Sequence, residues 1–123
     1  MTKILIVEDE AYLNKAFQIV LEKNGYKVET CFDGKEALEK AETFKPDLIL
    51  LDILMPNMNG KEFLKKYDIQ NTHKNVKILV LSNLETKDDT DDTYKLGAHK
   101  YFVKSLASPQ MLVKLVEQTL AGK

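Results

Sequence analysis

The sequence has few of the residues that build disulfide frameworks, cysteine-based metal clusters or membrane spans. Among its 123 residues there is one cysteine, Cys31, and no tryptophan. A single cysteine excludes an internal disulfide and a cysteine-based metal cluster, which suits a reducing, cytoplasmic setting. No apolar run approaches the roughly 20 residues that a membrane-spanning helix needs, and no signal-peptide pattern opens the chain. We therefore expect a cytoplasmic protein that does not contact a membrane.

An excess of charge of either sign is also missing. The 18 Lys and Arg residues against 19 Asp and Glu residues leave a net charge of -1. Without a basic block, the chain has no field that would attract nucleic acid. The fractions of hydrophobic residues (44%) and charged residues (30%) are ordinary for a globular protein. We expect a single domain over residues 1–123 that does not itself bind nucleic acid.

Five short apolar runs alternate with five segments of helical periodicity. A short run without polar residues is typical of a strand that is covered on both faces. Strands that alternate with helices indicate a parallel sheet with helices on both sides, so the predicted fold class is α/β, a doubly wound sandwich of three layers. The predicted strands are residues 4–7, 28–31, 48–51, 78–81 and 101–103.

The fourth expected helix, over residues 86–93, has the weakest pattern. Seven of these eight residues are Asp or Thr, and both types are poor helix formers in a helix interior. Asp88 and Asp89 lie near its N-terminus, where negative charge favours the helix dipole. We expect a short, mobile helix there.

Three carboxylates follow two of the predicted strands at their carboxyl ends. Glu8 and Asp9 follow the first strand, and Asp52 follows the third. Ligands of open α/β sheets bind at this edge, so the three side chains converge if the strands are neighbours. Two unit charges about 4 Å apart repel by roughly 4 kcal/mol at an effective dielectric near 20. Either one carboxyl is then protonated or a hard cation binds, and Mg²⁺ (or Mn²⁺ in its place) is the cation that we expect.

Helix capping by Glu8 and Asp9 is an alternative reading of the same acids, because acidic residues are common near the start of a helix. Capping leaves Asp52 unexplained.

A hydroxyl and an ammonium are predicted at the same edge of the sheet. Ser82 follows the fourth strand, and Lys104 follows the fifth. Either residue alone would be ordinary surface. Together with the acids they form the parts of a phosphoryl-transfer site, in which a carboxylate is the nucleophile and the hydroxyl and lysine contact phosphoryl oxygens.

Several short motifs occur in a fixed order along the chain. They are Ile6-Val7-Glu8-Asp9-Glu10, Asp47-Leu48-Ile49-Leu50-Leu51-Asp52 with Met55-Pro56 and Gly60, Leu81-Ser82, Leu96-Gly97-Ala98, and Tyr101-Phe102-Val103-Lys104. In this order and spacing they resemble the receiver domain of two-component response regulators, over essentially the whole chain. The resemblance implies a flavodoxin-like (βα)5 fold with strand order 2-1-3-4-5. It also implies transfer of a phosphoryl group to Asp52 from a histidine kinase or a histidine phosphotransfer protein.

The resemblance further implies a set of metal ligands. Asp9 and Asp52 would bind Mg²⁺ directly, together with the backbone carbonyl of Leu54, and Glu8 would bind it through water. The domain would catalyse its own phosphorylation and slow dephosphorylation at Asp52, although it would not be classed as an enzyme.

Contacts to the phosphoryl group and a switch are implied in the same way. Ser82 and Lys104 would contact the phosphoryl group, and phosphorylation would pull Ser82 inward, so that the ring of Tyr101 changes rotamer into the vacated space. The surface formed by the fourth helix, the fifth strand and the fifth helix would then control a downstream protein or a homodimer. Without the resemblance, Tyr101 is more simply a strand residue that packs on the sheet.

Four residues depart from the usual pattern of the family. Ser105 stands where the family usually has a proline after a cis bond, and a cis bond before another residue type costs about 3–4 kcal/mol, so we predict a trans bond. Asn83 replaces a small residue, and it either narrows the entrance for phosphate or supplies an extra hydrogen bond. Leu54 and Leu84 replace polar groups that guide an attacking water, which predicts slow self-dephosphorylation.

Three other functions compete with this reading. A phosphohydrolase with an aspartyl nucleophile usually has a second Asp where Leu54 stands. A dinucleotide or flavin binder needs a glycine-rich loop after the first strand, where the acids at Glu8 and Asp9 would repel phosphate. A pseudo-receiver, which docks without being phosphorylated, draws support from Ser105 and Asn83. No output segment follows Lys123, so we expect a stand-alone receiver or one cut from a longer chain.

Overall fold

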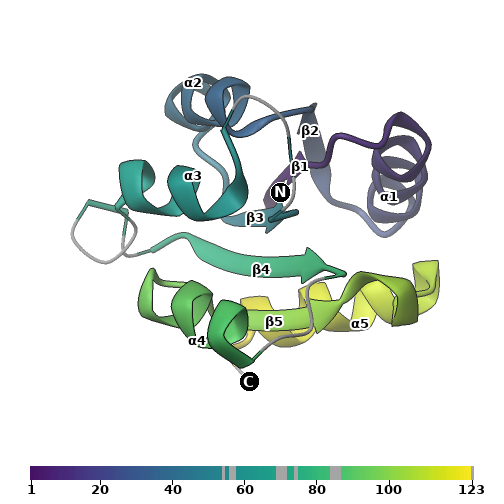
Figure 1. The fold of residues 1–123 in the computed structure, drawn as a ribbon. Helices are drawn as coiled ribbons and strands as arrows, with labels where there is room; N and C mark the ends of the chain where they lie inside the picture. Colours follow the sequence, from purple (N-terminus) through teal and green to yellow (C-terminus); the bar gives the residue numbers. More distant parts are fainter. Residues whose placement is uncertain (54, 56–57, 69–71, 74, 84–86, 123) are drawn as a thin grey trace.

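The computed structural model describes residues 1–53, 55, 58–68, 72–73, 75–83 and 87–122, with only the backbone given for residues 87–90. Within these residues five strands alternate with five α-helices (Figure 1). The strands are β1 (Lys3–Val7), β2 (Lys27–Cys31), β3 (Leu48–Leu51), β4 (Lys77–Ser82) and β5 (Lys100–Val103). The helices are α1 (Ala11–Lys23), α2 (Gly34–Phe44), α3 (Gly60–Tyr67), α4 (Lys87–Lys95) and α5 (Pro109–Leu120), and a 3-10 turn, η1 (Lys104–Leu106), follows β5.

The strands form one parallel sheet in the order β2-β1-β3-β4-β5. The predicted fold class and strand order are therefore confirmed. Val7 pairs with Leu51 at the carboxyl ends of β1 and β3, so the residues that follow them, Glu8 and Asp52, lie side by side. None of the described helices is long and apolar enough to cross a membrane.

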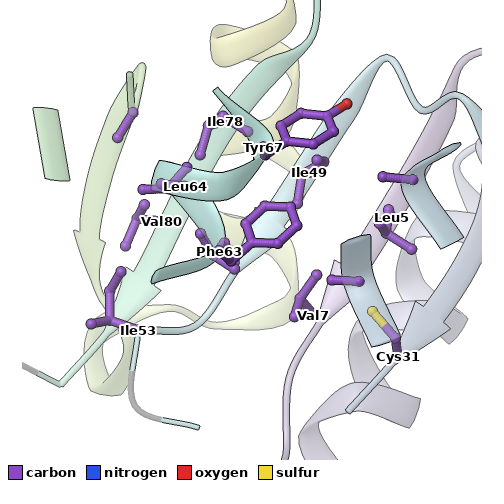
Figure 2. Packing of buried hydrophobic residues seen from close by; sticks show 14 residues of the cluster. Leu5, Val7, Cys31, Ile49, Ile53, Phe63, Leu64, Tyr67, Ile78 and Val80 are labelled. Carbon is purple, nitrogen blue, oxygen red and sulfur yellow. The ribbon is translucent and has the colours of Figure 1, made fainter. Parts of the chain in front are cut away.

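The apolar runs of the strands supply two separate cores, one on each face of the sheet. Alternate residues of β1 and β3 point to opposite faces, which is why both runs lack polar residues. One face packs against α1 and α5, and the other packs against α2 and α3, where Phe63 and Tyr67 of α3 lie over Ile49 and Ile78 (Figure 2). Cys31 is buried at the end of β2 on this second face.

Helix α4 differs modestly from the prediction. It runs over nine residues, from Lys87 to Lys95, and so extends beyond the predicted end at residue 93. The extension has a tertiary cause, because the Tyr94 hydroxyl accepts a hydrogen bond from the backbone N–H of Tyr101 on β5 at 3.0 Å. The contact ties the last turn of the helix to the edge of the sheet.

Gly60 begins α3 against the backbone of Asp52, and this contact predicts a cost for any larger residue. A Cβ at position 60 would lie 2.7 Å from the carbonyl oxygen of Asp52 and 2.8 Å from Cα of Ile53. Gly60→Ala is therefore expected to lower the free energy of unfolding, measured in urea, by about 2 kcal/mol.

Gly25 offers a control for this prediction. It has a φ of +91° and no atom within 4 Å of an added Cβ, and asparagine tolerates such a φ. Gly25→Asn should therefore cost less than about 1 kcal/mol. Equal losses in the two variants would contradict the steric argument.

Candidate functional site

The carboxyl ends of β1 and β3 bring three carboxylates together. Glu8, Asp9 and Asp52 each place one carboxylate oxygen within 4.8 Å of the others. The backbone holds them there, since the N–H of Asp52 donates to the Val7 carbonyl at 3.0 Å and the N–H of Glu8 donates to the Cys31 carbonyl at 3.1 Å. Three carboxylates at this spacing are a donor set that suits a hard divalent cation.

Lys104 enters the same cluster from the end of β5. Its Nζ lies 2.7 Å from Oε1 of Glu8, 2.9 Å from Oε1 of Glu10 and 3.1 Å from Oδ2 of Asp52. The lysine side chain is 6% exposed, and those of Glu8 and Asp52 are similarly buried. The ammonium therefore neutralises part of the negative charge of the cluster from within the protein.

Glu10 is a member of the cluster that was missing from the predicted site. The only signal for it in the sequence is that it is the third acid in a row, and it is also the N-cap residue of α1. The carboxylate of Glu8 accepts a hydrogen bond from the N–H of Glu10 at 3.0 Å. Helix capping does not account for the acids, because α1 has no side-chain capping hydrogen bond at its N-cap residue and Glu8 also contacts Lys104.

A small cavity opens onto the cluster. It has a volume of about 100 Å³ and is lined by Asp9, Glu10, Asp52, Asn83 and Lys104. Glu8 is buried, with 2% of its surface exposed, and does not line the cavity. Asp52 is therefore the buried carboxylate that also reaches the cavity.

The pKa values of Glu8 and Lys104 are both raised, for different reasons. Burial raises the pKa of Glu8 to about 7, although hydrogen bonds from Lys104 and from the N–H of Glu10 oppose the rise. Burial alone would lower the pKa of Lys104, but its hydrogen bonds to Glu8 and Glu10 and the charge of Asp52 raise it above its usual range. The lysine therefore stays charged, and Glu8 holds a proton to higher pH than an ordinary glutamate does.

The raised pKa of Glu8 predicts that the metal-free protein loses stability as the pH rises. Glu8 ionises near 4.5 in the unfolded chain and near 7 in the folded one, so the folded state binds more protons between these values. The free energy of unfolding should therefore fall by about 3 kcal/mol across this window.

Urea unfolding between about pH 4.5 and 7 in the presence of a chelator checks this dependence. Glu8→Gln should flatten the slope, because it removes the titrating group. Glu39→Gln, which changes an exposed acid on α2, should leave the slope as it is. A slope that survives Glu8→Gln would refute the assignment.

Comparison with known proteins decides the family. The sequence profile of the response regulator receiver domain matches residues 4–117. The chain is a response regulator receiver domain. This confirms the resemblance that the motifs predicted.

The receiver domain is similar to curated proteins and to solved structures. It is 42% identical over 102 residues to the alkaline phosphatase synthesis transcriptional regulatory protein PhoP of Bacillus subtilis, covering 83% of the chain and 42% of PhoP. It is 37% identical over 115 residues to the response regulator ArlR of Staphylococcus saprophyticus, covering 94% of the chain and 51% of ArlR. The chain thus spans about half the length, or less, of these relatives. The chemotaxis protein CheY4 of Vibrio cholerae shares the fold with a TM-score of 0.89 and 34% identity, covering 97% of this chain and 98% of that one.

Ser82 of the receiver domain lies at the predicted edge but inside the sheet. It is the last residue of β4, where it pairs with Val103, and it is fully buried. The prediction ended the strand one residue earlier, because a serine does not extend an apolar run. Ser82 is not among the described residues that line the cavity. Its hydroxyl would therefore have to approach a group bound there.

The remaining predictions for the receiver domain concern Tyr101, the peptide bond after Lys104, and two leucines. Tyr101 is partly buried and packs against the core on the α3 side of the sheet. No peptide bond among the described residues is cis, so the bond between Lys104 and Ser105 is trans, as predicted. Leu54 and Leu84, on which the carbonyl ligand and the slow dephosphorylation rest, lie outside the described residues.

Proposed function

We propose that this receiver domain is a phosphorylation-activated switch and that Asp52 accepts the phosphoryl group. One observation carries the proposal: the Asp52 carboxylate is buried at the end of β3, reaches the cavity, and lies 3.1 Å from the Nζ of Lys104. A nucleophile held beside a fixed positive charge is the arrangement that phosphoryl transfer needs.

The transfer would take place from a phosphohistidine of a histidine kinase or of a phosphotransfer protein. An oxygen of Asp52 attacks phosphorus and forms a P–O bond, while the P–N bond breaks and its electrons stay with the imidazole nitrogen, which takes up a proton. Lys104 balances charge on the phosphoryl oxygens, and Ser82 donates its hydroxyl to one of them. The domain thus promotes its own modification by holding these groups in place.

The acidic cluster fits Mg²⁺. Asp9 and Asp52 would hold the ion directly, Glu8 would hold it through water, and the carbonyl of Leu54 would complete the set on the protein side. When bound, the cation supplies positive charge that offsets the carboxylates and the phosphoryl oxygens.

The output of the switch is proposed to be a change in the surface formed by α4, β5 and α5. Ser82 pairs with Val103 of β5, and Tyr94 of α4 accepts the N–H of Tyr101 on β5. A shift of Ser82 toward a phosphoryl group would therefore reach β5 and α4 through direct contacts, and a rotamer change of Tyr101 would accompany it. A downstream protein, or a second copy of the domain, would read that surface.

Intact-mass measurement tests the proposal. The purified domain is incubated with Mg²⁺ and acetyl phosphate, and the expected result is a gain of one phosphoryl group that a chelator prevents. If neither acetyl phosphate nor phosphoramidate produces a gain, the proposal is wrong, and the domain is a pseudo-receiver that acts by docking alone.

A further inference from the structure

A hydrogen bond joins the two loops that follow β4 and β5. The side-chain Oδ1 of Asn83 accepts the backbone N–H of Ser105 at 3.1 Å. The last paired residues of these strands are Ser82 and Val103. The bond therefore continues the contact between the strands beyond the end of the sheet, with a side chain in place of a backbone carbonyl.

Lys104 lies between two residues whose backbone is held by contacts to β4 and the loop after it. Its predecessor Val103 is held by the sheet, and its successor Ser105 is held by Asn83. The carbonyl of Lys104 also accepts the N–H of Ala107 at 3.2 Å, which closes the turn η1. A lysine side chain has four rotatable bonds, so its ammonium is well placed only if its backbone is fixed.

We propose that Asn83 is a positioning residue that holds the backbone of Lys104, so that Nζ stays on Asp52 and its acidic neighbours. The bond needs an acceptor at position 83 and an N–H at position 105. Alanine would lack the first, and proline would lack the second. Asn83 and Ser105 are two of the positions at which the chain departs from the usual pattern of its family. In the structure they are hydrogen-bonded to each other.

A steric effect of Asn83 at the entrance of the cavity would act in the opposite direction. This residue lines the cavity together with Asp52 and Lys104, so its amide also takes up room at the entrance. The two readings predict opposite signs for Asn83→Ala. Loss of the hydrogen bond should slow phosphorylation, whereas removal of bulk should speed it.

The first measurement is made on the unphosphorylated domain by NMR. In Asn83→Ala the Ser105 amide should exchange with solvent about fivefold faster, and the ammonium signal of Lys104 should broaden. Asn83→Asp keeps an acceptor oxygen and should retain slow exchange. Asn75→Ala makes the same kind of change at the opposite end of β4 and should alter neither signal. Unchanged Ser105 exchange or an unchanged Lys104 signal in Asn83→Ala would overturn the proposal.

The second measurement rests on the proposed function and follows phosphoryl uptake from acetyl phosphate by intact mass. Asn83→Ala should react about fivefold more slowly than the wild type, and Asn75→Ala should react at the wild-type rate. An equal or faster rate in Asn83→Ala would overturn the positioning role. If the wild type takes up no phosphoryl group, the proposed function fails, while the Ser105 and Lys104 signals still decide whether Asn83 positions the lysine.

Discussion

Replacing Asp52 by alanine is expected to abolish phosphoryl uptake from acetyl phosphate, with a loss of at least about 100-fold. Of the four acids in the cluster, Asp52 alone is both buried and in contact with the cavity. Glu8 is buried and does not line the cavity, and its raised pKa of about 7 leaves it partly protonated and a poor nucleophile at neutral pH.

The matched control for Asp52→Ala is Glu10→Gln. Glu10 lines the same cavity and also contacts Lys104 at 2.9 Å, but it is exposed. The Glu10→Gln variant should take up the phosphoryl group at a rate within about tenfold of the wild type. Asp52→Ala removes one negative charge from a cluster with excess acid, so it should unfold in urea at no lower concentration than the wild type. Uptake that persists in Asp52→Ala would place the acceptor elsewhere.

The second large effect is expected from Lys104→Met. In metal-free buffer near pH 8 the free energy of unfolding should fall by about 3–5 kcal/mol, because the change leaves buried carboxylates without their cation. The loss should shrink near pH 5, where protonation relieves the repulsion. About 10 mM Mg²⁺ should stabilise Lys104→Met more than the wild type, since the ammonium and the metal compete for the same carboxylates.

Lys61→Met is the control for this experiment. Lys61 pairs with Asp92 at 3.4 Å, and the Asp92 side chain is 54% exposed. Its loss should cost less than about 1 kcal/mol, because exposed ion pairs contribute little. A similar loss in both variants, or a loss in Lys104→Met that does not depend on pH, would show that the effect comes from packing rather than charge.

The sheet could be predicted from the sequence, because a strand that is buried on both faces is an uninterrupted run of apolar residues. In β1 and β3 every second residue serves a different core, so Leu5 and Ile6 are both apolar and both fully buried. Parallel strands also end at one edge, which made the meeting of Asp9 with Asp52 predictable before the structure was known.

The internal geometry of the site was beyond the same reasoning. Which carboxylates a lysine contacts depends on the path of its backbone, and that path is determined by η1 and by the bond between Asn83 and Ser105. The inclusion of Glu10 depends on how α1 begins. The contacts of Lys104 with Glu10 and of Asn83 with Ser105 join segments far apart in the chain, for which no local pattern exists. The motifs located the chemistry at the edge of the sheet, but the contacts around Lys104 came only from the three-dimensional arrangement.

The hydroxyl of Tyr94 has a consequence for the solubility of the protein. β5 is an edge strand, and the exposed N–H groups of such a strand can pair with another chain and seed aggregation. Because the phenol occupies the N–H of Tyr101, a foreign strand must displace the last turn of α4 before it can pair there. The helix therefore protects the β5 edge at Tyr101 against intermolecular β-pairing, and any event that moves α4 away also exposes that edge.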